Sequence, residues 1–143
     1  MKKSAASPQD RGEQNEELLH LTLNGLLPDD KTLVLNLATR TGTLFSHGAG
    51  SGARIVTQQQ FSPNGMRVLV PLLQAYPLYC PYEVLLASLF PLSLEACQQQ
   101  LQEAWEMAIR PVRRAIGSIM AGLRSFGLTV HSLRRTGYLL KRL

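Results

Sequence analysis

The chain has 143 residues, 45% of them hydrophobic and 17% charged, so it holds enough apolar material for one globular core but not for two large domains. Its formal net charge is +5, and the charges are unevenly distributed: all ten acidic residues lie at or before Glu106, whereas residues 110–143 carry eight Lys or Arg and no carboxylate. The C-terminal third is therefore predicted to be the functional part of the chain, with a polyanion as its natural ligand. Contacts with phosphates favour binding because they release condensed counterions.

Residues 1–17 are polar and have no apolar periodicity, which predicts a disordered tail. From residue 18 apolar and polar side chains alternate, first over residues 19–23 and again over residues 33–37, as expected for strands with one buried face. Turn-forming Gly, Pro, Asn and Asp residues separate these short apolar runs. We therefore predict three or four antiparallel strands within residues 18–60.

At Phe61 the apolar period changes from two residues to about 3.6, the period of an α-helix. Ser62 is suited to cap a helix whose first turn contains Pro63, and the apolar residues that follow fall on one face. Pro71 predicts a kink or a short first segment, because a proline ring clashes with the preceding turn and donates no amide hydrogen. A second short helix is predicted over residues 82–90.

A third helix, capped by Ser93, is predicted to form a long link over residues 92–107. Its outer side carries a run of glutamines and three carboxylates, those of Glu95, Glu103 and Glu106. We expect that side to repel a nucleic-acid backbone. Trp105 is predicted to fill the core between this helix and the sheet rather than to stack on a base.

The C-terminal helix is predicted over residues 110–125, with Pro111 in its first turn and Gly127 as its left-handed cap. At 100° per residue its apolar side chains cluster on one side: Val112, Ile116, Ile119, Met120 and Leu123. The other side is small or cationic: Arg110, Arg114, Gly117, Ser118, Ala121 and Ser125. A helix that enters a major groove needs such a face, because small side chains let the backbone approach and arginines reach phosphates or guanine edges. A solvated face without a ligand is the alternative.

Residues 128–131 and 138–141 are predicted to be the two strands of a basic hairpin, with Arg134, Arg135 and Thr136 in its turn. We do not predict an enzyme, because the three histidines are far apart in the sequence. Residues 48–52 are rich in glycine but lack the Lys-Ser/Thr that follows in a phosphate-binding loop, so we expect them to be a flexible connection between strands. Cys80 and Cys97 have no CxxC pattern, so we expect two buried thiols and no metal or cofactor. No stretch approaches the roughly 18 to 20 apolar residues that span a bilayer, which predicts a cytoplasmic protein without a membrane partner.

Two segments resemble the OmpR/PhoB-type winged-helix DNA-binding domains. FSPNGMRVLVPLLQAYPLYCPYEVLLASL resembles their opening helices, and RPVRRAIGSIMAGLRSFGLTVHSLRRTGYLL resembles their recognition helix and wing, with Gly137-Tyr138 on the Gly-Tyr of the wing's return strand. The resemblance covers residues 61–143. It implies an α+β fold, a winged helix-turn-helix preceded by a small antiparallel sheet, which residues 18–60 would supply.

The resemblance implies a transcription regulator that binds duplex DNA sequence-specifically, here a standalone module without a receiver domain. Its expected DNA contacts are Arg110, Arg113, Arg114, Ser118, Arg124, Arg134, Arg135 and Thr136. The alternative is a winged-helix interaction module whose basic helix binds an acidic protein surface, on RNA polymerase or another regulator. A homodimer is a further open alternative.

Overall fold

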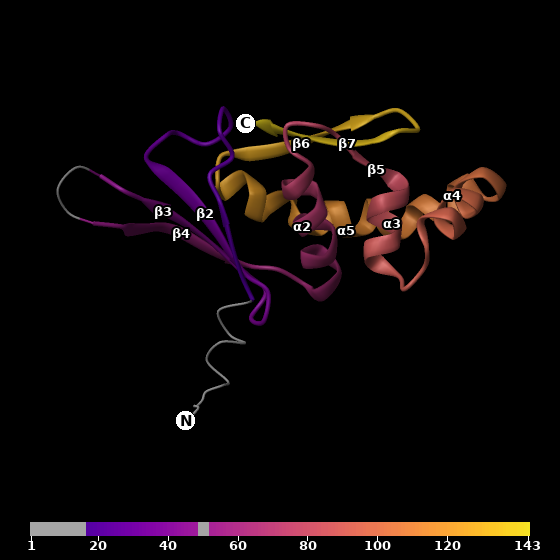
Figure 1. Ribbon diagram of the computed structural model, residues 1–143, viewed down its shortest axis with the longest axis horizontal. Helices are drawn as coiled ribbons and strands as arrows, with labels where there is room; N and C mark the ends of the chain where they lie inside the picture. Colours follow the sequence, from indigo (N-terminus) through magenta and orange to yellow (C-terminus); the bar gives the residue numbers. More distant parts are fainter. Residues whose placement is uncertain (1–16, 49–51) are drawn as a thin grey trace, which may run out of the picture.

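The computed structural model describes residues 17–48 and 52–143 (Figure 1). The predicted disordered tail, apart from Glu17, lies outside the described residues, as do residues 49–51 of the predicted glycine-rich connection. The fold is α+β, with a four-stranded antiparallel sheet followed by four helices and a three-stranded sheet.

The N-terminal sheet has its strands in chain order, β1-β2-β3-β4, each antiparallel to its neighbour. The strands are β1 (Leu18–Leu21), β2 (Lys31–Asn36), β3 (Thr41–Ser46) and β4 (Arg54–Gln60). Alternation predicted one buried face, and Leu33 and Leu35 of β2 are indeed fully buried. The prediction of three or four strands before residue 61 is confirmed, with four in the described part.

Four helices follow: α2 (Pro63–Ala75), α3 (Tyr82–Leu89), α4 (Leu94–Glu103) and α5 (Trp105–Ser125). Both predicted serine caps are confirmed. The Ser62 hydroxyl oxygen accepts a hydrogen bond from the Gly65 amide at 3.0 Å, and that of Ser93 accepts one from the Ala96 amide at 3.1 Å. Each cap satisfies an amide that the first helical turn leaves without a partner.

Of the two outcomes predicted at Pro71, a kink or a short first segment of the helix, the short segment is wrong. The helix is not cut short there but continues through the proline to Ala75. Val68 and Leu69 before the proline and Leu72 after it are buried almost completely. Burial of three such side chains contributes about 5 kcal/mol or more, which exceeds the roughly 3 kcal/mol that an interior proline costs.

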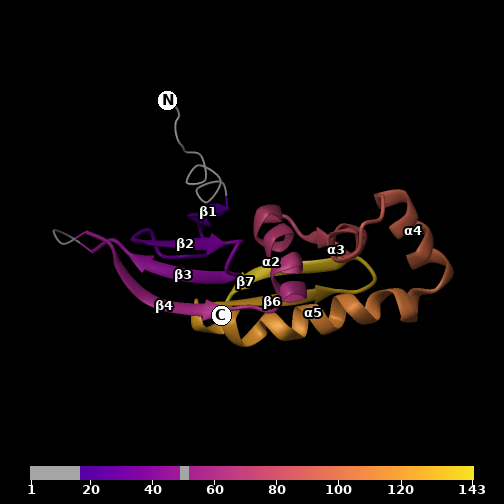
Figure 2. The same cartoon turned by 90° about the horizontal axis from the view of Figure 1, so that it is seen from below.

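The boundary between α4 and α5 is also different from the prediction. One long link helix to residue 107 and a new helix at Arg110 were expected, but the chain breaks at Ala104, whose φ is −146° and ψ is 63°. A straight helix over residues 94–125 would be about 48 Å long and would carry its first half away from the core. The break lets both α4 and α5 contact α3 (Figure 2).

The position predicted for Pro111 in a first turn is therefore wrong, since Pro111 lies inside α5. Its ring nitrogen has no hydrogen to donate to the Met107 carbonyl one turn earlier. Met107 lies at the surface and is 69% exposed.

The C-terminal sheet has the order β5-β7-β6, with β5 (Cys80–Pro81), β6 (Leu128–Leu133) and β7 (Gly137–Arg142). The predicted hairpin is confirmed, as is Gly127 at a left-handed φ of +82° after α5. Two-residue β5 gives no periodic signal and was not predicted. Gly137 is required where β5 and β7 meet, because a Cβ there would run into the Cys80 carbonyl oxygen.

Helix α5 joins the two sheets, since it contacts both β4 and β6 as well as the other helices (Figures 1 and 2). Near its C-terminal end, the Phe61 and Phe126 rings lie 6.3 Å apart. Gly122 of α5 leaves room for the Phe61 ring, which a Cβ at that position would meet. Among the described helices, none is long and apolar enough to cross a bilayer.

Replacing Gly137 with Ala should lower the free energy of unfolding by about 1 to 3 kcal/mol, because the new methyl group overpacks the contact between β5 and β7. Gly117→Ala is the matched control: nothing lies within 4 Å of a Cβ there, and Ala in a helix is more stable than Gly by about 0.5 to 1 kcal/mol. Urea unfolding of both variants measures the difference. Equal effects of the two substitutions would contradict this packing.

Candidate functional site

Helix α5 presents one continuous exposed stripe. Its exposed residues between Arg110 and Ser125 are Arg110, Arg113, Arg114, Gly117, Ser118, Ala121, Arg124 and Ser125. At 100° per residue they fall within an arc of about 140°, and at 1.5 Å per residue Arg110 and Arg124 are about 21 Å apart along the axis. The predicted division of this helix into an apolar and a small or cationic face is confirmed. We call these eight residues the α5 stripe.

The opposite face of α5 fixes the stripe toward solvent. Val112, Ile119 and Leu123 are fully buried, Ile116 is 5% exposed and Met120 is half-buried. Rotating the helix would expose these side chains and bury arginines, which is unfavourable on both counts. The orientation of the stripe is thus set by the core.

The middle of the α5 stripe is small. Nothing lies within 4 Å of where a Gly117 side chain would begin. The Ser118 hydroxyl donates to the Ala115 carbonyl at 2.6 Å, so its hydrogen is used within the helix while its oxygen can still accept. The Ser125 hydroxyl does the same with Gly122, also at 2.6 Å. A partner can therefore approach the helix backbone closely between the flanking arginines.

The cations of the α5 stripe are not neutralised by the described part of the protein. The single ion pair there joins Lys31 and Asp30, at 3.8 Å and in the N-terminal sheet. None of the eight C-terminal cations is therefore paired with a described carboxylate. The positive potential of the stripe remains available to a ligand.

Glu106 lies on a different helix from the one predicted. It was expected on the outer side of the link helix, but it lies exposed in the first turn of α5, four residues before Arg110. Helical spacing puts it on the same side as Arg110 and Arg113. The basic stripe thus ends at a carboxylate, whereas Glu95 and Glu103 are exposed on α4 as predicted.

The hairpin turn contains the other three predicted site residues, and all are exposed. The Thr136 hydroxyl donates to the Arg134 carbonyl at 2.9 Å, which closes the turn. Arg135 has a left-handed φ of +55°, and its guanidinium lies 4.4 Å from the centre of the Trp105 ring. This cation–π contact attaches the hairpin tip to the first turn of α5.

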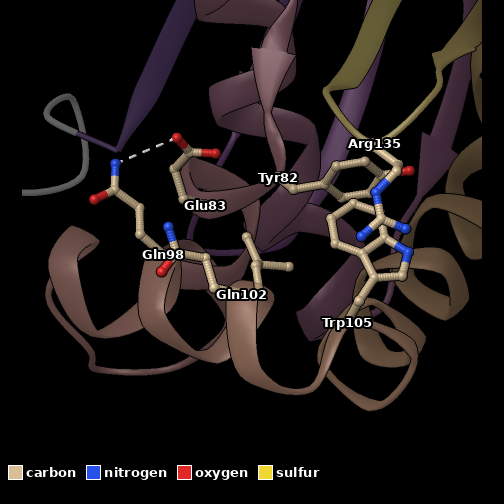
Figure 3. A pocket seen from close by; sticks show the side chains of 7 residues that line it. Tyr82, Glu83, Gln98, Gln102, Trp105 and Arg135 are labelled. Carbon is tan, nitrogen blue, oxygen red and sulfur yellow. Dashed lines mark hydrogen bonds between the residues drawn. The ribbon is translucent and has the colours of Figure 1, made fainter.

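Trp105 is consequently only partly in the core, where full packing was predicted. It is half-buried, with the Tyr82 ring edge-on at 5.1 Å and Arg135 over its ring (Figure 3). No sequence signal links Trp105 with Arg135, because the two residues belong to different elements that only the folded chain brings together.

The charge of Arg113 acts on Tyr138 of the hairpin. Burial, followed by a hydrogen bond with Tyr82, raises the pKa of Tyr138 in β7 to about 12, while the Arg113 cation acts in the opposite direction. Such an effect requires the guanidinium to be near the phenol. At the other end of the hairpin, the Leu143 amide donates to the Gly127 carbonyl at 2.9 Å, and Lys141 and Arg142 are exposed beside it.

The two cysteines are free and buried, as predicted. Burial raises the pKa of Cys80 to about 11, and the negative charge of Glu83 adds to the shift. The same two causes raise the pKa of Cys97. Both thiols are protonated and unreactive near neutral pH. Within residues 17–48 and 52–143, no cluster of three His, Cys, Asp or Glu side chains is placed to hold a metal ion.

In comparisons with known proteins, no family model, no curated protein and no solved structure matches the chain.

The raised thiol pKa predicts how stability changes at high pH. The folded-state pKa of Cys80 is above its ordinary value of 9.0. The buried thiol therefore makes its full contribution to the free energy of unfolding below pH 9, and this contribution is lost as the pH rises toward 11. Between pH 8 and 10.5 the loss should be on the order of 2 kcal/mol. Urea unfolding at both pH values should show a smaller loss for Cys80→Ala than for the native chain. Identical losses would refute the assignment.

Proposed function

We propose that the protein is a winged-helix transcription regulator that binds duplex DNA, with α5 as the recognition helix and the β6–β7 hairpin as the wing. The observation that carries the proposal is the α5 stripe: four exposed arginines around small residues, held outward by a buried face and not paired with a described carboxylate. Phosphates dominate the affinity of such a surface, and its arginines can also reach guanine edges.

The order of the elements supports the winged-helix arrangement. Two helices, α2 and α3, precede the long helix α5, and a hairpin follows it and pairs with the short strand β5. The OmpR/PhoB-type domains that the sequence resembles also carry an antiparallel sheet before their first helix, in the place of β1 to β4. Helix α4 is an additional element between the second helix and the recognition helix.

The position of each side chain suggests its role. Arg110, Arg113, Arg114 and Ser118 would enter the major groove, and Arg124, in the last turn of α5, would hold a phosphate. At the wing, Arg134 and Thr136 would reach the minor groove or the backbone. Arg135 would contribute less than Arg134, because its guanidinium is already engaged with Trp105.

A second candidate is a protein-interaction module. Phe90, Leu92 and Leu94 are exposed apolar side chains beside the exposed Glu95, which favours a protein contact in this part of the molecule. In this reading the basic stripe would bind an acidic surface of RNA polymerase or another regulator.

The double variant Arg113→Ala/Arg114→Ala should separate the two functions. For the native chain, about six neutralised phosphates give a slope of log affinity against log salt of roughly −5. The double variant should bind random duplex DNA at least about tenfold more weakly, with a slope shallower by about two. Fluorescence anisotropy at salt concentrations from about 50 to 200 mM, where the affinity depends strongly on salt, measures both the affinity and the slope.

Arg54→Ala is the control for the double variant, since Arg54 is an exposed cation at the start of β4 and is not one of the stripe residues. It should leave the DNA affinity within about twofold. A native slope near zero would defeat the DNA proposal. Unchanged DNA binding by the double variant together with a lost protein complex would favour the interaction module.

Glu106→Gln should raise the affinity for duplex DNA about two- to fivefold at low salt, because it removes a carboxylate beside Arg110 that repels phosphate. Glu95→Gln, an exposed carboxylate on α4, is the matched control and should have no effect. The same anisotropy assay at two salt concentrations distinguishes them, since the gain should diminish as salt increases. An equal gain from both variants would indicate that net charge alone matters.

A further inference from the structure

A cavity of about 480 Å³ lies where α3, α4, the first turn of α5 and the hairpin tip meet (Figure 3). The side chains that matter in its lining are Tyr82, Glu83, Gln98, Gln102, Trp105 and Arg135. Its volume is in the range of pockets that hold small organic molecules. DNA binding as proposed above does not use its interior.

One wall of the cavity is aromatic and already holds a cation. The Arg135 guanidinium lies 4.4 Å from the centre of the Trp105 ring, and the Tyr82 ring meets Trp105 edge-on, with an interplanar angle of 78°. Indole is the side chain that attracts cations most strongly over its face. The contact shows that the face of the Trp105 ring is accessible to a cation.

The other wall is negative. Glu83 lies in the first turn of α3 and is half-buried. Its carboxylate accepts one described side-chain hydrogen bond, from the Gln98 amide at a long 3.5 Å (Figure 3), and forms no ion pair within the described residues. Its negative charge adds to the burial that raises the pKa of Cys80 and Cys97. A half-buried carboxylate with so few partners favours a cationic ligand.

We propose that this cavity binds a small organic cation of the alkylammonium class, whose head lies on Trp105 and Tyr82 with Glu83 as its counter-ion, and that the ligand competes with Arg135 for the Trp105 ring. An anionic ligand is disfavoured, because Glu83 repels it while Arg135 is engaged with the ring. Since the ligand and Arg135 exclude each other, binding frees the Arg135 side chain from α5, while the Tyr82 amide still donates to the Thr136 carbonyl and holds the backbone of the turn. Any ligand effect on the hairpin's partner then follows from that release.

Trp105 is the one tryptophan of the chain, so its fluorescence reports on the cavity directly. Choline is a suitable probe, with 3,3-dimethylbutan-1-ol as its uncharged isostere. Titrated into the full chain at constant ionic strength and without DNA, choline should change the emission saturably with a Kd of about 1 to 10 mM, which corresponds to a weak cation–π site with one counter-ion. The isostere should give no saturable change.

Two variants test the proposed contacts. Arg135→Ala removes the competitor and should tighten choline binding about fivefold, whereas Glu83→Gln removes the counter-ion and should weaken it at least about fivefold. Circular dichroism and thermal melting verify that both variants are folded. The proposal is overturned by no saturable change in the native chain and in Arg135→Ala, by equal binding of the isostere, or by loss of binding in Arg135→Ala. Because DNA is absent, these outcomes are independent of the DNA assay.

Discussion

Burial of one face of α5 is the constraint on which the candidate site depends. Ile109, Val112, Ile119 and Leu123 are all fully buried, each worth about 1.5 to 3 kcal/mol relative to exposure. They contact a core built from both sheets and the other helices, so α5 cannot rotate or slide without losing them. The arginines of the stripe need no partner of their own to be held outward, because the apolar residues between them set the direction.

The hairpin is held at both ends, which fixes its position relative to the stripe. Gly127 turns the chain out of α5 at one end, and the contact of Arg135 with Trp105 ties the tip to the first turn of the same helix at the other. Between them, Leu128 and Leu140 are buried under the sheet. If α5 and the hairpin bind DNA as proposed, these contacts set the distance between the two elements that would contact it. Trp105 therefore links the geometry of the site with a cavity that lies outside it.

The eight cations of residues 110–143 form no ion pair with a described carboxylate, but two carboxylates lie in the same part of the molecule. Glu106 closes the stripe at its N-terminal end, and Glu83 faces the cavity below the hairpin tip. Glu106 precedes Arg110 by one helical turn and Glu83 lines the same cavity as Arg135, and neither carboxylate forms an ion pair in the described structure. Glu106 therefore limits the positive surface of α5, and Glu83 gives the cavity a negative charge.

The sequence by itself determined the parts of this protein that rest on local pattern. Period-two alternation predicted the strands of the N-terminal sheet, Ser62 and Ser93 predicted two helix starts, and the 3.6 period of residues 110–125 predicted which face of α5 is buried and which is exposed. These predictions hold because side-chain direction and cap chemistry depend on neighbours a few residues away.

Only the tertiary structure decided the break at Ala104, the continuation of α2 through Pro71, the short strand β5 and the contact of Arg135 with Trp105. In each case the deciding term is packing between segments distant in the chain. Burial on α3 and in the core outweighs the local preference of a proline or of an unbroken apolar stripe. Arg135 and Trp105 meet because the hairpin folds back along α5. Their separation in the sequence does not predict that contact.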